Sequence, residues 1–363
     1  MNILILAKES HVGGLVKFTY NLAHGLSKKR DTNVVIGISP SDANEPLKPF
    51  NLHEIDFETK SPLRIIDNYR KIARLVKEYK IDIIQAHNRL TALYAWFYCT
   101  FHRRVKYIWV SLSVQIPSSF IYRITTKYGA CAVAGSEGVK LLEENLRIPK
   151  DKIRIIDLGI DLSIFTRTSL EEQENLKGKL GIKQGERVIL LYGRLDKIKG
   201  HEYLLESLRL LKNSNYRVVF PGENPEYKSH LLETIKKYNL EDRIIFPGYI
   251  NGREYLSITD LMVLPSIKDG VSYAFLETIS MGVPVIRTNA GGEYEEIKDL
   301  CFWVDYGDNN SLAQLIDDFL SEEEKFSKMA DLAKKESYRF SLENVVNKYY
   351  DLYCSILDNN AKI

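Results

Sequence analysis

Short apolar runs that alternate with amphipathic helical patterns predict an α/β protein made of two doubly wound parallel-sheet domains. Six apolar runs fall in the first half of the 363-residue chain and six in the second. Their apolar character is continuous, as expected of parallel strands that are covered on both faces. The length also suits two domains, because single cores rarely grow beyond about 250 to 300 residues.

The expected elements follow one another as strand and helix. Amphipathic helices are predicted, for example, at 66–80 and 201–212, where apolar residues recur at helical spacing. Repetition of this kind is typical of doubly wound sheets. The expected strands are NILILA, NVVIGI, IDIIQA, KYIWVSL, ACAVAG and IRIIDLG, then RVILLYG, YRVVFPG, RIIFPG, DLMVLPS, VPVIRTN and CFWVDYG.

The repetition is interrupted once. Residues 165–180 are polar and show no strand pattern, so we expect the interdomain linker there. The first domain should then span 1–165 and the second 166–340. The final helix, about 341–358, has no strand after it and is expected to pack on the first domain. Two such sheets would face each other across a central cleft, the usual place for a ligand in these folds.

Composition excludes several classes of protein. The four cysteines lack metal-type spacing and indicate reduced thiols in a cytoplasmic protein. The longest apolar run, residues 90–101, is shorter than the roughly 18 to 20 residues that a membrane-spanning helix needs. The apolar start is a strand pattern and lacks the features of a signal peptide.

The net charge of +2 conceals an asymmetry. Residues 1–165 carry 24 Lys and Arg against 16 Asp and Glu, whereas the rest carries 26 against 32. A basic first domain with the aromatic stretches AWFYCTFHRRVKYIW and QIPSSFIYRITTKYG is compatible with peripheral contact with an anionic membrane. The alternative is that these aromatic residues belong to the core. No dense Lys and Arg stripe appears, so we do not expect a nucleic-acid partner.

A pair of cations lies at one turn of the second domain. Arg194 follows a strand and Gly193, and Lys199 precedes Gly200 and a helix. Arginine offers a rigid fork of donors and lysine a point charge, a combination that suits a diphosphate. The alternative is two solvated cations in a loop.

A second turn combines carboxylates with a helix start. The strand DLMVLPS is followed by Asp269 and Gly270, and then by a helix that contains Glu277. Backbone N–H groups from Val271 to Ala274 would fall in the first helical turn, where an anion binds well. Gly270 would let a phosphate approach the backbone. The alternatives are a helix-start carboxylate for Asp269 and an exposed helical position for Glu277.

The first domain offers fewer candidates. Gly13 and Gly14 lie between the first strand and the first helix, where a glycine pair permits close approach to a ligand. His87 follows the third strand, so it is either an acceptor-side residue or a histidine satisfied within the structure. No Gly-x-Gly-x-x-Gly pattern is present, which argues against a nicotinamide enzyme.

Together these motifs resemble the retaining glycosyltransferases of family 4, which have the GT-B fold. Their order and spacing are specific to that family, and the resemblance covers most of the chain. It is carried by the glycine pair at 13–14, IRIIDLGID at 153–161, GRLDKIKG at 193–200, FPGYI at 246–250, DGVSYAFLE at 269–277, MGVPVI at 281–286 and GGEYEE at 291–296.

The resemblance implies a fold of two Rossmann-like domains and a reaction. A sugar would pass from a UDP- or GDP-linked donor to a hydroxyl of a sugar or lipid-linked glycan, with retention of the anomeric configuration. The donor is a substrate, so no cofactor is expected, and no metal. The protein would act in the cytoplasm or peripherally on the inner face of the cytoplasmic membrane, in polysaccharide or glycolipid assembly.

The resemblance also assigns residues. Arg194 and Lys199 would neutralise the leaving diphosphate, and Glu277 would hold the ribose, with Asp269 as the other catalytic candidate. The remaining donor-binding candidates are Gly13, Gly14, Gly193, Gly222, Tyr249, Ile250, Gly270, Val271, Ser272, Tyr273 and Ala274.

Three positions depart from the family pattern. Asp269 stands where the family usually has glutamate, one methylene longer. Ser111 or Ser113 stands where relatives often have a histidine, so Ser113 becomes an acceptor-side candidate, and His87 or His102 is a possible substitute. Leu158 replaces the family's usual asparagine. The departures at Asp269 and Ser113 leave a non-catalytic nucleotide-sugar-binding subunit as one alternative function. A nucleotide-sugar epimerase on the same fold is the other, although the two cations and the spacing of Asp269 and Glu277 argue against it.

Overall fold

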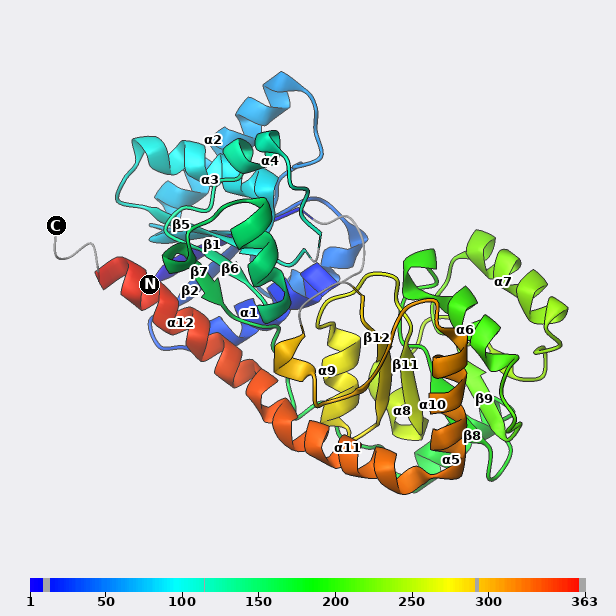
Figure 1. Ribbon diagram of the computed structural model, residues 1–363. Helices are drawn as coiled ribbons and strands as arrows, with labels where there is room; N and C mark the ends of the chain where they lie inside the picture. The colour runs from blue at the N-terminus through cyan, green and yellow to red at the C-terminus, as the bar shows by residue number, and fades with distance from the viewer. Residues whose placement is uncertain (9–13, 114, 291–293, 359–363) are drawn as a thin grey trace. The chain divides into compact units, whose positions relative to one another are not determined.

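The computed structural model describes residues 1–8, 14–113, 115–290 and 294–358, with Glu323 described by its backbone only. Two compact units make up the chain: Met1–Ile160 with the segment that begins at Phe340, and Asp161–Arg339. Each unit holds one parallel sheet with helices packed on it (Figure 1). The predicted fold class, two α/β parallel-sheet domains, is confirmed.

The sheet of the first unit has seven strands in the order β3-β2-β1-β4-β5-β6-β7. In its centre, Leu4 pairs with Val35 on one side and Ile84 on the other, and all three side chains are buried. The strands are β1 (Asn2–Ala7), β2 (Asn33–Ile38), β3 (Asn51–Glu54), β4 (Ile83–Ala86), β5 (Lys106–Ser111), β6 (Ala132–Ala134) and β7 (Ile153–Ile155).

Strand β3 is not among the strands expected from the sequence. Its sequence, NLHE, is polar, and as an edge strand with no buried residue it carries no apolar signal. The helices of this unit are α1 (Gly14–Ser27), α2 (Pro62–Glu78), α3 (Arg89–Phe101), α4 (Phe120–Thr125) and α12 (Leu342–Asp358).

The C-terminal helix α12 packs on the first unit, beside α1 (Figure 1). A Cβ at Gly25 of α1 would lie 2.2 Å from Val346, and a Cβ at Gly159 would lie 2.9 Å from Val345. Glycine at both positions therefore lets the backbones approach α12 closely. Tyr353 of α12 donates a hydrogen bond to the Gln85 side chain of β4, which ties the helix to the sheet.

The sheet of the second unit has six parallel strands in the order β10-β9-β8-β11-β12-β13. They are β8 (Arg187–Leu190), β9 (Tyr216–Val219), β10 (Ile244–Ile245), β11 (Leu261–Leu264), β12 (Val285–Thr288) and β13 (Phe302–Val304). The helices are α5 (Leu170–Lys179), α6 (His201–Leu208), α7 (Pro225–Lys237), α8 (Gly252–Ile258), α9 (Tyr273–Ser280), α10 (Asn309–Ser321) and α11 (Glu323–Glu336).

The stretch expected as a linker, 165–180, holds helix α5 instead. The Ser169 hydroxyl accepts from the Glu172 amide, and the Glu172 carboxylate accepts from the Ser169 amide. This capping box marks a helix start, which an inspection for strand patterns alone does not reveal. The division between the units falls at Ile160 and Asp161. At this division the segment that ends the first part of the first unit lies beside the segment that leads into α12, because the Leu342 amide donates to the Ile160 carbonyl at 2.7 Å.

Within the described residues, the helices are all too short or too polar to cross a membrane.

Candidate active site

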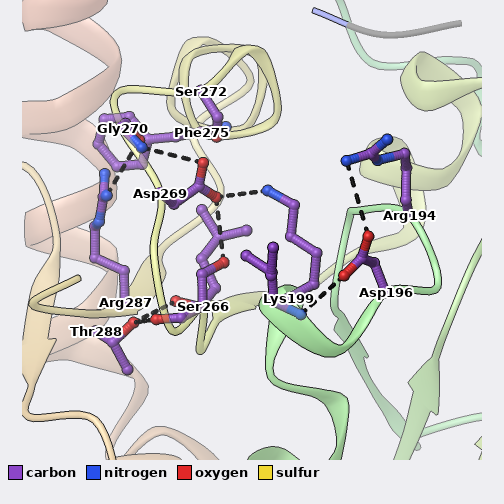
Figure 2. A network of polar contacts seen from close by, with 12 residues as sticks. Arg194, Asp196, Lys199, Ser266, Asp269, Gly270, Ser272, Phe275, Arg287 and Thr288 are labelled. Carbon is purple, nitrogen blue, oxygen red and sulfur yellow. Dashed lines mark hydrogen bonds and ion pairs between the residues drawn. The ribbon is translucent and has the colours of Figure 1, made fainter. Parts of the chain in front are cut away.

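An ion pair between Lys199 and Asp269 forms the centre of the site in the second unit. The Lys199 ammonium lies 2.7 Å from Asp269 Oδ2, and the two side chains are only 19% and 15% exposed. Ser266 donates to the same carboxylate oxygen at 3.2 Å, and the Gly270 amide donates to Oδ1 at 3.1 Å (Figure 2). Asp269 therefore joins the lysine to the loop that leads into α9.

Glycines allow the lysine loop to reach this position. Gly200 has φ +76°, and a Cβ there would lie 1.9 Å from the Pro265 carbonyl oxygen. The Ile267 amide also donates to the Ile198 carbonyl at 2.8 Å, which fixes the two loops to each other. A Cβ at Gly193 would lie 3.3 Å from the aliphatic stem of Lys199, so glycine leaves room for that stem.

Arg194 lies in the same loop but points to a different partner. Its guanidinium makes a long ion pair of 3.9 Å with Asp196 and remains 68% exposed (Figure 2). Asp196 is otherwise engaged in capping, because it accepts from the Ile198 amide at 2.9 Å. Arg194 is thus a mostly solvated cation that can turn to a ligand at little cost.

The start of α9 is held rigidly. Ser272 is its N-cap and accepts from the Phe275 amide at 3.4 Å. The buried Arg287 of β12 donates to the Gly270 carbonyl at 3.2 Å and lies 5.2 Å from the Phe275 ring. Val271 and Tyr273 are buried, whereas Ser272 and Ala274 are half-buried. The first-turn amides of a helix have no partners within the helix. Here the contacts of Arg287 with Gly270 and Phe275 hold that first turn in place.

Glu277 is 1% exposed, so the alternative of an exposed helical position is wrong. Its carboxylate shares a hydrogen bond with the Tyr192 hydroxyl, and burial together with that negative charge raises the pKa of Tyr192. Gly252 leaves room for this hydroxyl, since a Cβ there would lie 2.2 Å from it. Glu277 is therefore a hydrogen-bond acceptor held in a fixed position, one helical turn after the start of α9.

The other donor-side candidates lie on neighbouring loops. Gly222 has φ +101°, and its amide donates to the Gly248 carbonyl at 2.7 Å. Tyr249 is 78% exposed beside the half-buried Ile250, an aromatic ring open to a ligand. Glu295, which belongs to the GGEYEE motif and was not a donor-binding candidate, is exposed and pairs with Lys298 at 2.8 Å.

In the first unit, His87 is a buried histidine with both ring nitrogens engaged. Nδ1 lies 3.1 Å from the Thr19 hydroxyl, and Nε2 lies 2.7 Å from the Gln85 amide nitrogen. Burial lowers the pKa of His87 to about 3. This environment favours the structural alternative for His87.

The remaining first-unit candidates are more open. Ser113 is exposed and donates to the Gln115 carbonyl at 2.7 Å. His102 caps the end of α3 and stacks on Tyr98 at 4.2 Å. Gly14 is the exposed first residue of α1. Gly13 and the glycines at 291–292 lie outside the described residues.

Sequence reasoning missed the residues that brace the site. Ser266, Arg287 and Tyr294 each bond to Asp269 or Gly270, and Tyr192 bonds to Glu277. An arginine within the apolar run VPVIRTN was the available sequence signal for Arg287, whereas nothing local indicates the others. Among the described residues, no group of three or more His, Cys, Asp or Glu is arranged to hold a metal ion.

Two family models match the chain, and together they cover most of it. The model for glycosyltransferase family 4 matches residues 12–164, and that for glycosyl transferases group 1 matches residues 172–336. This chain belongs to the family 4 glycosyltransferases. The boundary between the matched regions falls next to the division between the two structural units.

Curated relatives of this family 4 glycosyltransferase are distant. An uncharacterized glycosyltransferase of Methanocaldococcus jannaschii is 28% identical over 56% of this chain, and N-acetyl-alpha-D-glucosaminyl L-malate synthase of Bacillus anthracis is 28% identical over 59%. The chain spans just over half of these relatives, 54% and 57% of their lengths. An alpha-monoglucosyldiacylglycerol synthase of Streptococcus pneumoniae is 26% identical over 80% of this chain and 70% of its own length.

Solved structures share the GT-B fold with this family 4 member. A glycosyltransferase from Rickettsia africae superposes with a TM-score of 0.88, at 26% identity, over 99% of both chains. HepE from Anabaena, crystallised with UDP and glucose, superposes with a TM-score of 0.84 at 19% identity, over 98% of this chain and 100% of its own.

Proposed function

We propose that this chain transfers a sugar from a nucleotide diphosphate sugar to an acceptor hydroxyl, with retention of the anomeric configuration. The observation that carries the proposal is the 2.7 Å pair of Lys199 and Asp269 at the braced start of α9. This arrangement places a cation, a carboxylate that can accept hydrogen bonds from sugar hydroxyls, and the first amides of α9 on two loops that contact each other. Such a combination suits an anionic diphosphate that is linked to a sugar.

The ion pair balances the charge of Lys199 with that of Asp269. An arriving diphosphate competes with Asp269 for the Lys199 ammonium, which has three donors. Asp269 then becomes available to the hydroxyls of the sugar. Arg194, mostly exposed in the same loop, turns from Asp196 to the second phosphate. The positive end of α9 adds to the stabilisation of the charge that develops on the leaving group.

We also propose that the reaction needs no metal ion, because Arg194, Lys199 and the α9 amides supply the positive charge. The departing phosphate accepts the proton of the attacking hydroxyl, so that attack occurs on the face the leaving group vacates. Addition of EDTA should then leave the turnover unchanged. A loss of activity that Mg²⁺ or Mn²⁺ restores would refute this part of the proposal.

The donor and acceptor are proposed by class. Structures with the same fold are complexes with UDP and with UDP-glucose, which supports a UDP-linked donor, with a GDP-linked donor to be compared. The relatives include an alpha-monoglucosyldiacylglycerol synthase, whose name indicates a glycolipid product and so supports a lipid-type acceptor, with a sugar acceptor to be compared. The exposed Tyr249 ring is suited to cover the nucleotide base.

Substitution of the two cations tests this function. Lys199→Ala and Arg194→Ala should each lower transfer from the preferred donor by about 100-fold or more, because a lost donor to a developing anion costs that much. Lys197→Ala changes an exposed cation of the same turn and is the matched control. Transfer is measured over a panel of UDP- and GDP-sugars. Normal turnover in Lys199→Ala would exclude the diphosphate role.

We further propose that the first unit rests on an anionic membrane. Phe120 and Ile121 of α4 are 73% and 67% exposed, and Phe101 of α3 is 68% exposed, so these side chains are not core residues. Cations accompany them: Arg89 lies over the Tyr122 ring at 3.6 Å, and Lys127 lies over the Trp96 ring at 4.9 Å. Exposed apolar residues among cations are typical of an interfacial surface.

A vesicle sedimentation assay tests this contact. Phe120→Ser with Ile121→Ser should lower the affinity for phosphatidylglycerol vesicles by about 100-fold or more, since each substitution removes roughly 1.5 to 3 kcal/mol of apolar burial. The control is Leu232→Ser with Leu332→Ser, two exposed leucines of the second unit. Equal binding of both double variants would contradict the proposal.

A further inference from the structure

The first unit contains a basic hollow at the amino edge of its sheet. It has a volume of about 660 Å³, and its lining comes from the end of α3, the starts of β5, β6 and β7, and the last turns of α12. Ligands of open α/β sheets ordinarily bind at the carboxyl edge. The amino edge is the opposite one, so this hollow is separate from any acceptor site at the carboxyl edge.

Four cations line the hollow. They are Arg103 after α3, Lys106 at the start of β5, Lys152 just before β7, and Arg154 within β7. None of the described side chains that line it is acidic. The Arg154 guanidinium is fixed by donating from Nη1 to the carbonyls of Asp151 and Ile153 at 2.8 and 2.9 Å. The hollow therefore collects positive charge from two segments that are distant in sequence, 103–106 and 152–154.

The thiols in the hollow do not offset this charge. Burial raises the pKa of Cys99 to about 12 and that of Cys131 to about 11, against which Lys106 and the pair Lys152 and Arg154 act only in part. Both thiols are therefore neutral at physiological pH. Their role is to form a small apolar floor.

Part of the lining is apolar. Trp96 and Val105 line the hollow together with Leu352 and Ile356 of α12, and these four side chains are its apolar wall. Helix α3 also carries two exposed rings outside the lining, because Phe97 and Phe101 are 48% and 68% exposed and lie 5.4 Å apart, centre to centre. A ligand with an anionic head on the cations and an apolar portion on this wall would satisfy both surfaces.

Gly129 helps to shape the floor. It has φ +67°, and a Cβ there would lie 2.1 Å from the Tyr107 carbonyl oxygen. The next amide, that of Ala130, donates to the same carbonyl at 2.8 Å. The chain therefore crosses close to β5 and leaves the space above it open.

We propose that this hollow binds a phosphate-bearing amphiphile, with the phosphate among Arg103, Lys106, Lys152 and Arg154 and the apolar portion against Trp96, Leu352 and Ile356. The volume is that of a small-molecule site. A mixed lining of cations and apolar side chains favours this class over a simple sugar. The two sources of the phosphate, a lipid and a soluble metabolite, are separated by the test.

The test uses the full chain and soluble short-chain probes. Calorimetry compares dihexanoyl phosphatidic acid with dihexanoyl phosphatidylcholine, glycerol 3-phosphate and inorganic phosphate. We expect dihexanoyl phosphatidic acid to bind about tenfold or more tightly than any of the others, because it alone uses both surfaces. Trp96 fluorescence should change on binding, and Trp96→Phe should remove that change.

Charge reversal locates the site. Arg103→Glu with Lys152→Glu, both exposed, should weaken phosphatidic acid binding by about tenfold or more. Arg104→Glu with Lys150→Glu makes the same charge change at exposed neighbours outside the lining, and should alter binding by no more than about twofold. Thermal stabilisation by the nucleotide sugar should be the same in both double variants, which separates this site from the donor site.

Three outcomes overturn the proposal. The first is the absence of measurable phosphatidic acid binding at millimolar concentration, with a correctly folded protein by circular dichroism. The second is equal weakening in the two double variants. The third is inorganic phosphate that binds as tightly as phosphatidic acid, since the apolar wall would then contribute nothing.

Discussion

Each unit contains one buried histidine whose protonation destabilises the fold at low pH. His87 is enclosed by Thr19 and Gln85, and His201 is enclosed by the rings of Phe220 and Tyr227. Burial lowers the pKa of His87 to about 3 and that of His201 to about 4, the latter opposed in part by Asp196. Neither histidine is exposed enough to bind a ligand.

The sign of the pH dependence follows from these directions. Both pKa values lie below the ordinary 6.5, so the unfolded chain binds more protons between pH 6.5 and about pH 4. The stabilising contribution is complete above pH 6.5 and is lost as the pH falls, at about 1.4 kcal/mol per pH unit for each histidine.

His201→Phe should therefore flatten the acid limb for the second unit. Phenylalanine keeps the packing against Phe220 and cannot be protonated. The urea midpoint is measured from pH 7 to pH 4.5, and the wild-type value should fall more steeply than that of the variant. His230→Phe, a substitution of a mostly exposed ring in the same unit, is the control. Parallel curves for His201→Phe and the wild type would contradict the assignment.

At the scale of elements, the site depends on how one loop passes another. Lys199 ends a short turn, and Gly200 then begins the approach to α6 directly against the Pro265 carbonyl at the end of β11. Any side chain at Gly200 would push these loops apart. The Lys199–Asp269 pair spans the same two loops, so its geometry is set by that close contact.

Gly200→Ala should thus cost more than its backbone conformation alone. We expect a loss of about 3 kcal/mol or more in the free energy of unfolding, together with weaker donor binding. Gly185→Ala is the matched control, because Gly185 also has a positive φ, +85°, but no heavy atom lies within 4 Å of its Cβ position. It should cost only about 1 to 2 kcal/mol. Equal losses in urea unfolding would exclude the steric argument.

For the molecule as a whole, the first unit is completed by the end of the chain. Helix α12 belongs to the same compact unit as Met1–Ile160 and has five buried side chains, those of Val345, Val346, Tyr349, Leu352 and Tyr353. Burial of each such side chain contributes about 1.5 to 3 kcal/mol, so their sum is comparable to the whole stability of a domain. The first unit is therefore assembled from both ends of the chain.

Truncation after Arg339 should unfold the first unit and spare the second. We expect scanning calorimetry to show the loss of one transition, and limited proteolysis to leave a protected fragment that begins near Asp161. Truncation after Asp358 removes only the residues beyond α12 and should leave both transitions in place. Retention of both transitions in the shorter chain would show that α12 is dispensable.

Local sequence was sufficient for most elements because buried parallel strands are continuous apolar runs. Every strand except β3 lies within an expected run, and β3 is a polar edge strand whose only signal is its pairing with β2. The polar stretch at 165–180 was expected to be a linker for the same reason, since α5 has no buried residue and no apolar stripe. Pattern methods detect burial, so elements without it escape them.

The sequence by itself determined the fold class, the family and the loops that carry Arg194, Lys199, Asp269 and Glu277, because these depend on local periodicity and on motifs within a few residues. Only the tertiary structure decided that Lys199 and Asp269, seventy positions apart, are ion-paired, that Glu277 is buried against Tyr192, and that His87 is enclosed. The charge state and exposure of a side chain are set by neighbours from other strands and loops, and no local pattern encodes them.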